Sequence, residues 1–377
     1  MEDEFQLWLG NHDSSKFGRA VLGWYRKHKR DLPWRKSPEA YRVWVSEIML
    51  QQTRIETVVD YYDRFLKRFP DVHSLAAAKV DDVLSLWEGL GYYRRARSLH
   101  AAAKVVAEEL GGCLPQDLAG LLKLPGIGRY TAGAILSIAS NQRQPILEGN
   151  TIRLHARLAA CPNDIDDSQV RKQMWEFAGA VMPSRSPGDF NQALMDIGST
   201  ICRPNDPDCK SCPVVNFCES FSRNCQAGIP YRESRVEYEV LRETALIVNR
   251  RNKFLVLQRS PDEWWSGLWD FPRVRLKPQS NSSRKFPSAN DLRLAQSQLR
   301  EQFGLVGTPR PIGFQLKHAV TKYRITLDCL EIKDVAGRLR TIGNCRWQSL
   351  GQIQELTLTA SARRIVSRLT QNLKGQK

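Results

Sequence analysis

Residues 124–132 read Leu-Pro-Gly-Ile-Gly-Arg-Tyr-Thr-Ala, a tight turn with two glycines that opens a helical pattern. Glycine lets a backbone approach a phosphate closely, and the N–H groups at the start of a helix attract the negative charge of that phosphate. An ordinary turn between two helices would look the same. The stretch therefore predicts a helical hairpin and leaves open whether the hairpin contacts a nucleic acid.

The chain divides into a helical part and a mixed part. Up to about residue 220, apolar residues recur at helical spacing, and the joints between these runs contain Gly or Pro. Farther on, residues 244–249 and 253–258 have the composition of two strands around a polar turn, and two short helical patterns follow. The sequence therefore predicts three segments, namely an all-α domain at 1–222, a linker at 223–239 and an α+β domain at 240–377.

The charge balance is strongly basic, with 56 Lys and Arg against 40 Asp and Glu and a formal net charge of +16. Basic side chains that neutralise phosphates release counterions, so this surplus favours a nucleic-acid partner. No apolar run approaches the length of a membrane span, and the acidic start at residues 1–4 is unlike a signal peptide. We expect a cytoplasmic protein without membrane contact, associated with the nucleoid if its source is bacterial.

Four of the nine cysteines cluster with the spacing C-x6-C-x2-C-x5-C, at Cys202, Cys209, Cys212 and Cys218. In a cytoplasmic protein such clustering indicates a metal centre and not a disulfide framework. Four thiolates suit zinc as well as an iron–sulfur cluster, so the count alone leaves the metal open.

The glycine turn resembles the helix-hairpin-helix of the endonuclease III superfamily of DNA glycosylases. The spacing of the four cysteines is also similar to the cluster spacing of that superfamily. Within it, the chain is similar to the MutY-type adenine DNA glycosylases in three further motifs, which are SEIMLQQT at 46–53, GLGYY at 89–93 and NQAL at 191–194. The resemblance spans roughly residues 17–369. It implies an all-α glycosylase domain with one [4Fe-4S] cluster on the four cysteines, followed by an α+β Nudix-like domain.

Two carboxylates are the candidate catalytic pair. Glycosidic cleavage needs an acid that protonates the leaving base and a negative charge near the oxocarbenium-like sugar. Glu47 lies in an apolar stretch, where desolvation would raise its pKa, and it matches the proton donor of the family. Where similar proteins have Asp-Gly-Asn, this chain has Glu148-Gly149-Asn150. We assign oxocarbenium stabilisation to Glu148, although a misplacement of about 1 Å can cost roughly 100-fold in rate.

The resemblance also implies a pocket for the adenine base. Tyr130 stands where related glycosylase/lyases have a nucleophilic lysine, and a phenol cannot form a Schiff base, so base excision without strand cleavage is expected. Asn150 would orient the catalytic groups. The other positions similar to the pocket lining are Arg30, Arg35 and Gln192. Without the resemblance, Tyr130 would be interpreted as a half-buried aromatic residue and Asn150 as a loop amide. The other three would be interpreted as residues of solvated helix surfaces.

Four further residues match positions that grip DNA in the family. An enzyme that acts on a base in a duplex must extrude that base and fill the gap it leaves. Gln52 and Tyr92 match the wedge residues, and an amide and an aromatic ring suit this task by hydrogen bonding and stacking. Gly126 and Gly128 belong to the hairpin that would hold the phosphates.

The second domain resembles a Nudix module without its catalytic residues. Around Gly304, only Glu301 remains of the glutamates that bind metal in a Nudix box, so we expect no nucleotide hydrolysis. The resemblance instead implies a check for 8-oxoguanine opposite adenine. Similar proteins use a Phe-Ser-His loop for this check, and the corresponding residues here are His318, Val320, Thr321 and Lys322. A plain β-hairpin would show the same alternation.

These expectations amount to a DNA-repair enzyme that excises adenine mispaired with 8-oxoguanine or guanine in double-stranded DNA, acting as a monomer. Two alternatives remain at this level. One is a glycosylase/lyase like endonuclease III, against which Tyr130 and the second domain both argue. The other is an iron–sulfur DNA-binding protein whose catalysis is weakened or lost, an interpretation that the Glu148 replacement keeps open.

Overall fold

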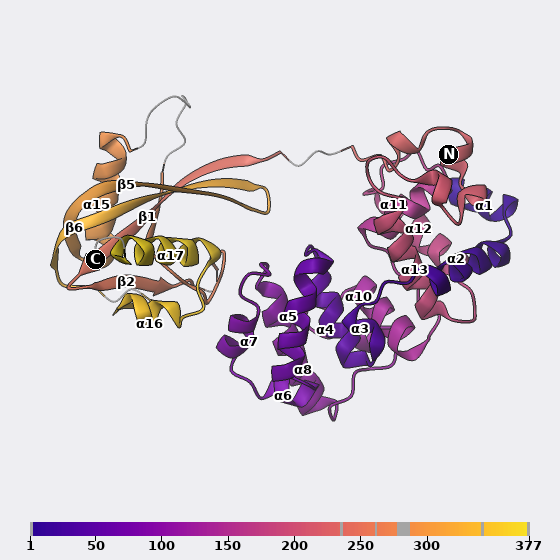
Figure 1. Ribbon diagram of the computed structural model, residues 1–377, viewed down its shortest axis with the longest axis horizontal. Helices are drawn as coiled ribbons and strands as arrows, with labels where there is room; N and C mark the ends of the chain where they lie inside the picture. The colour runs from indigo at the N-terminus through magenta and orange to yellow at the C-terminus, as the bar shows by residue number, and fades with distance from the viewer. Residues whose placement is uncertain (1–2, 234–236, 261, 277–286, 341–342, 375–377) are drawn as a thin grey trace. The chain divides into compact units, whose positions relative to one another are not determined.

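The structure is a computed structural model that describes residues 3–233, 237–260, 262–276, 287–340 and 343–374. It forms two compact units, of which one comprises Met1–Leu86 with Arg94–Arg235 and the other Trp87–Tyr93 with Val236–Lys377. The first unit is helical and the second is built around a sheet, as the sequence predicts (Figure 1). Residues 234–236 of the predicted linker lie outside the described residues.

The helices of the first part of the chain have the following bounds: α1 Glu4–Asn11, α2 Ser14–His28, α3 Pro33–Lys36, α4 Ala40–Leu50, α5 Ile55–Arg68, α6 Val72–Ala76, α7 Val80–Leu86, α8 Arg94–Glu109, α9 Leu118–Leu122, α10 Arg129–Ala134, α11 Gly149–Leu158, α12 Ser168–Ala180, α13 Pro187–Thr200 and α14 Glu219–Ser222. A π-helical turn, η1 (Ile135–Ala139), continues α10. Short 3-10 turns lie at Cys209–Ser211, Val215–Phe217 and Gln226–Gly228.

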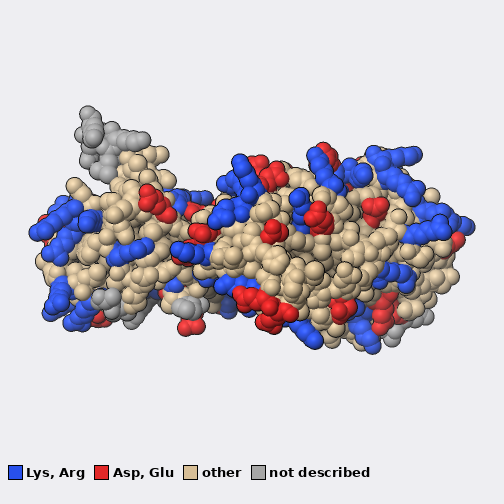
Figure 2. Space-filling view, turned by 90° about the horizontal axis from the view of Figure 1, so that it is seen from below, with Lys and Arg blue, Asp and Glu red and all other residues tan. Residues whose placement is uncertain are grey.

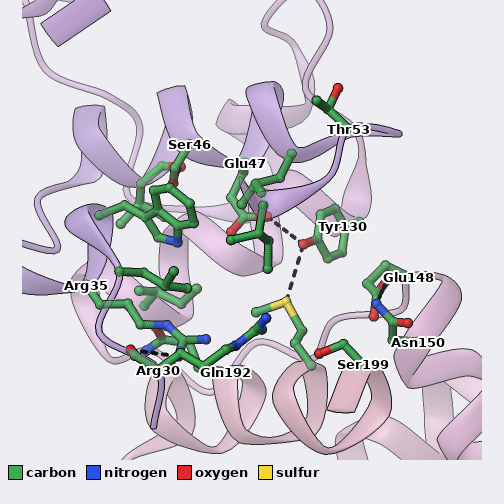
Figure 3. Close-up of a pocket in the computed structure, with 17 residues that line it drawn as sticks. Arg30, Arg35, Ser46, Glu47, Thr53, Tyr130, Glu148, Asn150, Gln192 and Ser199 are labelled. Atoms are coloured by element: carbon green, nitrogen blue, oxygen red, sulfur yellow. Dashed lines mark hydrogen bonds between the residues drawn. The ribbon is translucent and has the colours of Figure 1, made fainter. Parts of the chain in front are cut away.

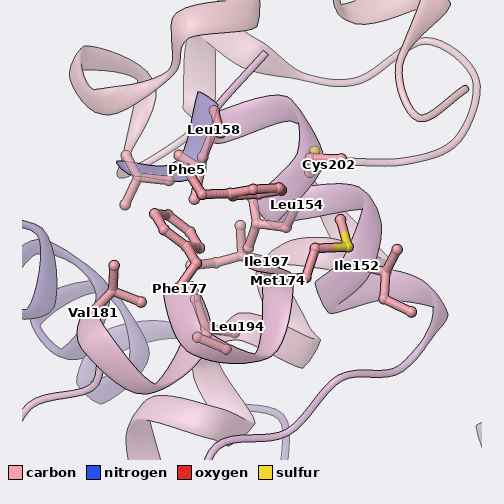
Figure 4. Packing of buried hydrophobic residues seen from close by; sticks show 14 of the residues in the cluster. Phe5, Ile152, Leu154, Leu158, Met174, Phe177, Val181, Leu194, Ile197 and Cys202 are labelled. Carbon is pink, nitrogen blue, oxygen red and sulfur yellow. The ribbon is translucent and has the colours of Figure 1, made fainter. Parts of the chain in front are cut away.

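Helical periodicity explains how these elements bury their apolar faces. In α5, Val58, Tyr62 and Phe65 recur three and four residues apart and are all buried. In α12, Met174 and Phe177 do the same and pack with Leu154 of α11 in one apolar cluster (Figure 4). Close packing of this kind holds α11 and α13 in fixed positions relative to each other.

The glycine turn forms the predicted helical hairpin between α9 and α10. Gly126 has a φ of +79°, and a Cβ at this position would lie 2.5 Å from the Cβ of Ser98, so only glycine fits without a shift. Gly128 is the N-cap residue of α10. The hairpin therefore sets where α10 begins and, with it, where Tyr130 lies.

Among its described residues, the second part of the chain contains the sheet and three helices. The bounds are β1 Glu239–Arg250, β2 Lys253–Gln258, β3 Trp269–Asp270, β4 Arg273–Arg275, β5 Leu305–Val320, β6 Tyr323–Gly337, β7 Cys345–Gln348, α15 Ala289–Phe303, α16 Leu350–Gln354 and α17 Ala360–Lys374. The order in the sheet is β3-β2-β1-β6-β5, with β4 paired to β1 and β7 to β2. β1 and β6 are parallel, and β5 and β6 form an antiparallel hairpin.

Strand alternation divides this unit into two cores. Ala245 and Ile247 of β1 pack in the cluster that contains Ile365 of α17. Leu246 and Val248 pack on the opposite face, in the cluster that contains Leu299 of α15. Helices therefore cover both faces of the sheet, which explains why residues 245–248 of its central strand are all apolar and do not alternate with polar residues.

The β5–β6 hairpin ends in a two-residue turn. Val320 pairs with Tyr323, which leaves Thr321 and Lys322 at the tip. Thr321 has a φ of +50°, in the left-handed region that tight hairpin turns require. Among the described residues, no helix combines the length and apolar character needed to span a membrane.

Candidate active site

A cavity of about 170 Å³ lies among α3, α4, α10, α11 and α13 of the helical unit. Its walls include all seven residues that the sequence assigned to catalysis and to the adenine pocket, namely Arg30, Arg35, Glu47, Tyr130, Glu148, Asn150 and Gln192 (Figure 3). These residues are up to 162 positions apart in the chain, and the helix packing brings them to one place.

Glu47 is the buried acid of this cavity, on the inner face of α4 with 4% of its surface exposed. The hydroxyl of Tyr130 donates a hydrogen bond of 2.5 Å to its Oε2. Burial raises the pKa of Glu47 to about 7, while the Tyr130 hydrogen bond lowers it and the charge of Glu148 raises it further. Near neutral pH this carboxyl is therefore partly protonated.

Glu148 occupies the N-cap position of α11. Its Oε1 accepts a hydrogen bond of 2.9 Å from the N–H of Thr151, and its Oε2 accepts one of 3.2 Å from Nδ2 of Asn150. Burial raises its pKa, whereas these donors from Asn150 and Thr151 act in the opposite direction. The positive end of a helix also favours a charged carboxylate. Figure 3 shows Glu148 and Asn150 side by side at the edge of the cavity.

Arg153 fixes Asn150 from behind, a role that the sequence did not suggest. Its Nη2 donates a hydrogen bond of 2.9 Å to Oδ1 of Asn150, and its Nε donates one of 2.7 Å to the carbonyl of Cys202. Gly198 of α13 allows this close approach, because a Cβ there would lie 2.8 Å from the Cβ of Asn150. A continuous chain of hydrogen bonds thus runs from the cysteine loop to Glu148.

Asp196 is a second residue that the sequence reasoning missed. It is buried on α13, where Arg35 donates to its Oδ2 at 2.7 Å and to its Oδ1 at 3.0 Å. Arg30 also donates to Oδ1, through Nε at 2.8 Å. The available signal was an aspartate within an otherwise apolar helical stretch, since such a residue is rarely buried without a cationic partner. Asp196 therefore holds both arginines at the cavity wall.

The four clustered cysteines line one small apolar pocket beside α11. Arg157, which is buried, donates from Nη1 to Sγ of Cys202 at 3.4 Å. Burial, followed by the charge of neighbouring thiolates, raises the pKa of Cys212 to about 12 and that of Cys218 to about 11. Among the described residues, no three His, Cys, Asp or Glu side chains are arranged to hold a single metal ion.

The residues expected to grip DNA lie outside the cavity lining. Gln52 is exposed with a φ of +56°, and Tyr92 is 54% exposed with a φ of +48°. Left-handed backbone in residues with side chains is uncommon and is enriched at functional positions. Gly126 and Gly128 lie in the turn before α10.

The predicted lesion-reading residues lie at different distances from the tip of the β5–β6 hairpin. Thr321 and Lys322 form its tip, and the Thr321 hydroxyl donates a hydrogen bond of 2.8 Å to the carbonyl of Val320. Lys322 forms an ion pair of 2.5 Å with Glu239. His318 lies lower on β5, with its ring 5.5 Å from that of Trp265.

The surface charge is mixed on the face drawn in Figure 2, where Lys and Arg side chains are spread among Asp and Glu. Some of the basic residues near the hairpin motif have structural partners. Arg129 stacks on the ring of Trp175 at 3.9 Å, and Arg95 donates to the carbonyls of Ile48 and Met49 at the end of α4. A net positive charge alone therefore does not locate a DNA-binding face.

Comparisons with known proteins agree with this geometry. Residues 45–179 match the family described as HhH-GPD superfamily base excision DNA repair protein, and residues 243–368 match the NUDIX domain. A solved structure of a thermostable thymine-DNA glycosylase is similar to 56% of this chain and 97% of its own, with a TM-score of 0.51 and 26% identity. The predicted fold class, a helix-hairpin-helix domain followed by a Nudix-like domain, is confirmed.

Curated relatives named adenine DNA glycosylase cover most of the chain. The protein from Rattus norvegicus is 36% identical over 337 residues, which are 74% of this chain and 64% of the rat protein. The protein from Buchnera aphidicola subsp. Schizaphis graminum is 36% identical over 262 residues, which are 69% of this chain and 76% of that protein. This chain therefore belongs to the adenine DNA glycosylase family.

Proposed function

We propose that this chain is a monofunctional adenine DNA glycosylase, which hydrolyses the N-glycosidic bond of an adenine flipped out of a duplex. The observation that carries the proposal is that Glu47 and Glu148 line the same cavity while their surroundings differ. Glu47 is buried with a pKa raised to about 7, and Glu148 receives donors from a helix N-terminus. Burial raises the pKa of both carboxyl groups, and the donors on Glu148 oppose that rise, so the pair can supply an acid and an anion at one pH.

The acid step belongs to Glu47. Because the Tyr130 hydroxyl donates to Oε2, the proton of the neutral carboxyl is left on Oε1. From there it can pass to a ring nitrogen of the bound adenine, which makes the base a better leaving group. The cavity of about 170 Å³ has room for a single base and not for a base pair.

The anionic step belongs to Glu148. As the glycosidic bond breaks, positive charge develops on the sugar, and a carboxylate held in place beforehand stabilises that charge without reorganising. Asn150 and the N–H of Thr151 orient the Glu148 carboxylate, and Arg153 in turn orients Asn150. This arrangement supports a working catalytic pair despite the glutamate in place of aspartate.

Strand cleavage by a lyase step is not part of the proposal. A lyase needs an amine that forms a Schiff base with the sugar. The cavity lining, all of it within the described part of the chain, contains no lysine, and Tyr130 is engaged with Glu47. The expected product is an abasic site in an intact strand.

We also propose that the β5–β6 hairpin checks the opposite base for 8-oxoguanine, with Thr321 as the reading residue. Since its hydroxyl proton is directed to Val320, the oxygen presents lone pairs outward. 8-Oxoguanine carries a hydrogen on N7 that can donate to such an oxygen, whereas N7 of guanine is itself an acceptor. Lys322 is paired with Glu239, which leaves the selective contact to Thr321.

The four cysteines fit one [4Fe-4S] cluster. They surround a common apolar pocket, and the buried guanidinium of Arg157 next to Cys202 suits a group with net negative charge. Such a cluster would stabilise the loop that positions Arg153. Purified protein should contain iron and acid-labile sulfide, and stoichiometric zinc in place of both would overturn this assignment.

A single-turnover assay tests the activity. The full chain, in excess over duplexes that carry A:8-oxoguanine, A:G or A:C, should release adenine from the first two and leave the strand uncut until alkali is added. Strand cleavage without alkali would support a lyase. Tight duplex binding without release of adenine would support a DNA-binding protein that has lost its catalytic activity. Action as a monomer in the cytoplasm or nucleoid, with domains at 1–222 and 240–377 joined by 223–239, belongs to the same proposal.

A further inference from the structure

A second cavity, of about 180 Å³, lies beside the lower part of the β5–β6 hairpin and the start of α17. Lys317 and Arg364 line it, and none of its lining residues, all of them described, is Asp or Glu. Neither cation forms an ion pair with a carboxylate in the described part of the chain, although nearby Arg259 and Arg273 do. The cavity therefore has an uncompensated positive charge.

One wall of this cavity is the indole of Trp265, held in an unusual backbone conformation. Trp265 has a φ of +60°, which is strained for a bulky residue and persists only when the surroundings hold it. The guanidinium of Arg273 lies 5.0 Å from the ring centroid. Arg273 is itself fixed by ion pairs of 2.8 Å to Asp270 and 3.1 Å to Glu243. The aromatic wall thus rests on a buried ion cluster.

His318 supplies a polar group without a protein partner. Both of its ring nitrogens are shielded from solvent, and neither has a hydrogen-bond partner among the described residues. Buried polar atoms are usually paired, so the ring of His318 leaves this wall of the cavity with unused hydrogen-bonding capacity. Either tautomer of the ring offers one N–H donor.

The other side of Trp265 has a mixed charge. A cavity of about 210 Å³ there is lined by Glu243, Asp262 and Glu263, together with Arg259 and Arg275. Arg259 pairs with Glu263 and Arg275 with Glu243, so most of this charge is compensated. An anionic ligand is therefore favoured on the side of Lys317 and Arg364, where none of the described lining residues carries a carboxylate.

We propose that the basic cavity binds a backbone phosphate of the DNA strand whose base the hairpin inspects. Arg364 would contact the phosphate, Lys317 on the edge strand β5 would add positive charge beside it, and the adjoining nucleotide would lie against Trp265. A free nucleotide offers the same chemistry. The DNA strand is favoured because Lys317 and His318 are on β5, within four residues of Thr321 at the tip. The proposal rests on the proposed function only in taking DNA as the partner.

Salt-dependent binding tests this site. The probe is a duplex with 8-oxoguanine opposite 2′-fluoro-2′-deoxyadenosine, which resists cleavage, and Kd is measured over a series of NaCl concentrations. Replacing both exposed cations (Lys317→Gln with Arg364→Gln) should lower the slope of log Kd against log salt by about 0.9, and should weaken binding roughly eightfold near 0.1 M salt. The matched control Arg293→Gln, an exposed residue of α15 outside the cavity, should leave the slope unchanged.

A second variant tests the aromatic wall. Trp265→Leu should weaken binding at least about fivefold with the salt slope preserved, because stacking is lost and the cations remain. Thermal melts of both variants establish that the fold is intact. An unchanged affinity in a folded Trp265→Leu protein would contradict the proposed stacking.

Titration with dGMP and with inorganic phosphate separates the two sources of phosphate. Neither should compete with the duplex at millimolar concentration. If dGMP binds the parent and not the double variant while the duplex slope is unchanged, the cavity serves free nucleotides and the proposal fails. An unchanged slope without dGMP binding also overturns it. If the parent fails to excise adenine but the slope falls as expected, the proposed function fails and the phosphate site stands.

Discussion

The hydroxyl of Tyr130 donates a hydrogen bond of 2.5 Å to Glu47, so the proposed acid and the phenol expected in place of a lyase lysine form one unit. Desolvation raises the pKa of Glu47 to about 7, and the phenol opposes that rise because it stabilises the carboxylate. The unit therefore keeps the acid protonated in part at neutral pH and able to give up its proton.

Glu47→Gln should leave duplex binding intact and lower single-turnover adenine release by about 100- to 10,000-fold, because an amide cannot act as a general acid. Glu56→Gln, on the exposed side of α5, is the matched control and should be unaffected. Adenine release within tenfold of the parent would remove Glu47 from the acid role.

The rate of excision should fall as pH rises through about 7, because Glu47 acts in its protonated form and the carboxylate form predominates above its pKa. Single-turnover rates between pH 5.5 and 9, at constant ionic strength, measure this limb. A rate that increases across the same interval would require Glu47 to act as a base.

The free energy of unfolding should also depend on pH through the ionisation of Glu47. The pKa of Glu47 in the folded chain, about 7, lies above its ordinary value of 4.5, so the folded state holds the proton more tightly and stability is lost as pH rises between these values. Above pH 7 the cost is about 3 kcal/mol, which Glu47→Gln should remove. Urea unfolding at pH 5 and pH 8.5 should show that the variant is more stable than the parent only at the higher pH.

Tyr130→Phe should move the fall in excision rate with rising pH to a higher pH. Without the phenol the Glu47 carboxylate loses a donor, so its pKa rises further. A structural role alone would lower the rate at every pH and leave the limb in place, and the pH profile distinguishes the two.

Glu148→Asp should retain at least the rate of the parent, since aspartate is a good N-cap residue and keeps the charge. Glu148→Gln keeps the length but not the charge and should lose about 100- to 1,000-fold. Single-turnover rates of the two variants should be compared directly. If Asp were worse than Gln, side-chain reach and not charge would decide the rate.

Asp196→Asn should lower the free energy of unfolding by about 3 kcal/mol, because it leaves Arg30 and Arg35 without their buried counter-charge. Asp166→Asn removes an exposed ion pair with Arg171 and should cost less than about 1 kcal/mol. Urea denaturation measures both. Equal effects would mean that the Asp196 pair is no stronger than a surface pair.

Local pattern was sufficient for much of this protein. The periodicity of apolar residues indicated the helices, the composition of short runs around a polar turn indicated the strands, and the turn at 124–132 with the cysteine spacing indicated the kind of fold. These features depend on neighbours within a few residues, so the sequence alone determined them. The candidate residues Glu47, Tyr130 and Glu148 came from the resemblance to the MutY-type family, which rests on motifs of this local kind.

Tertiary structure alone decided which distant residues meet. Asp196 reaches Arg30 across 166 positions and Arg153 reaches Cys202 across 49, and no spacing in the sequence encodes either contact. The pKa of Glu47 likewise depends on burial by several helices together. Such properties arise from packing between segments far apart in the chain, and periodicity within one segment carries no information about its partners.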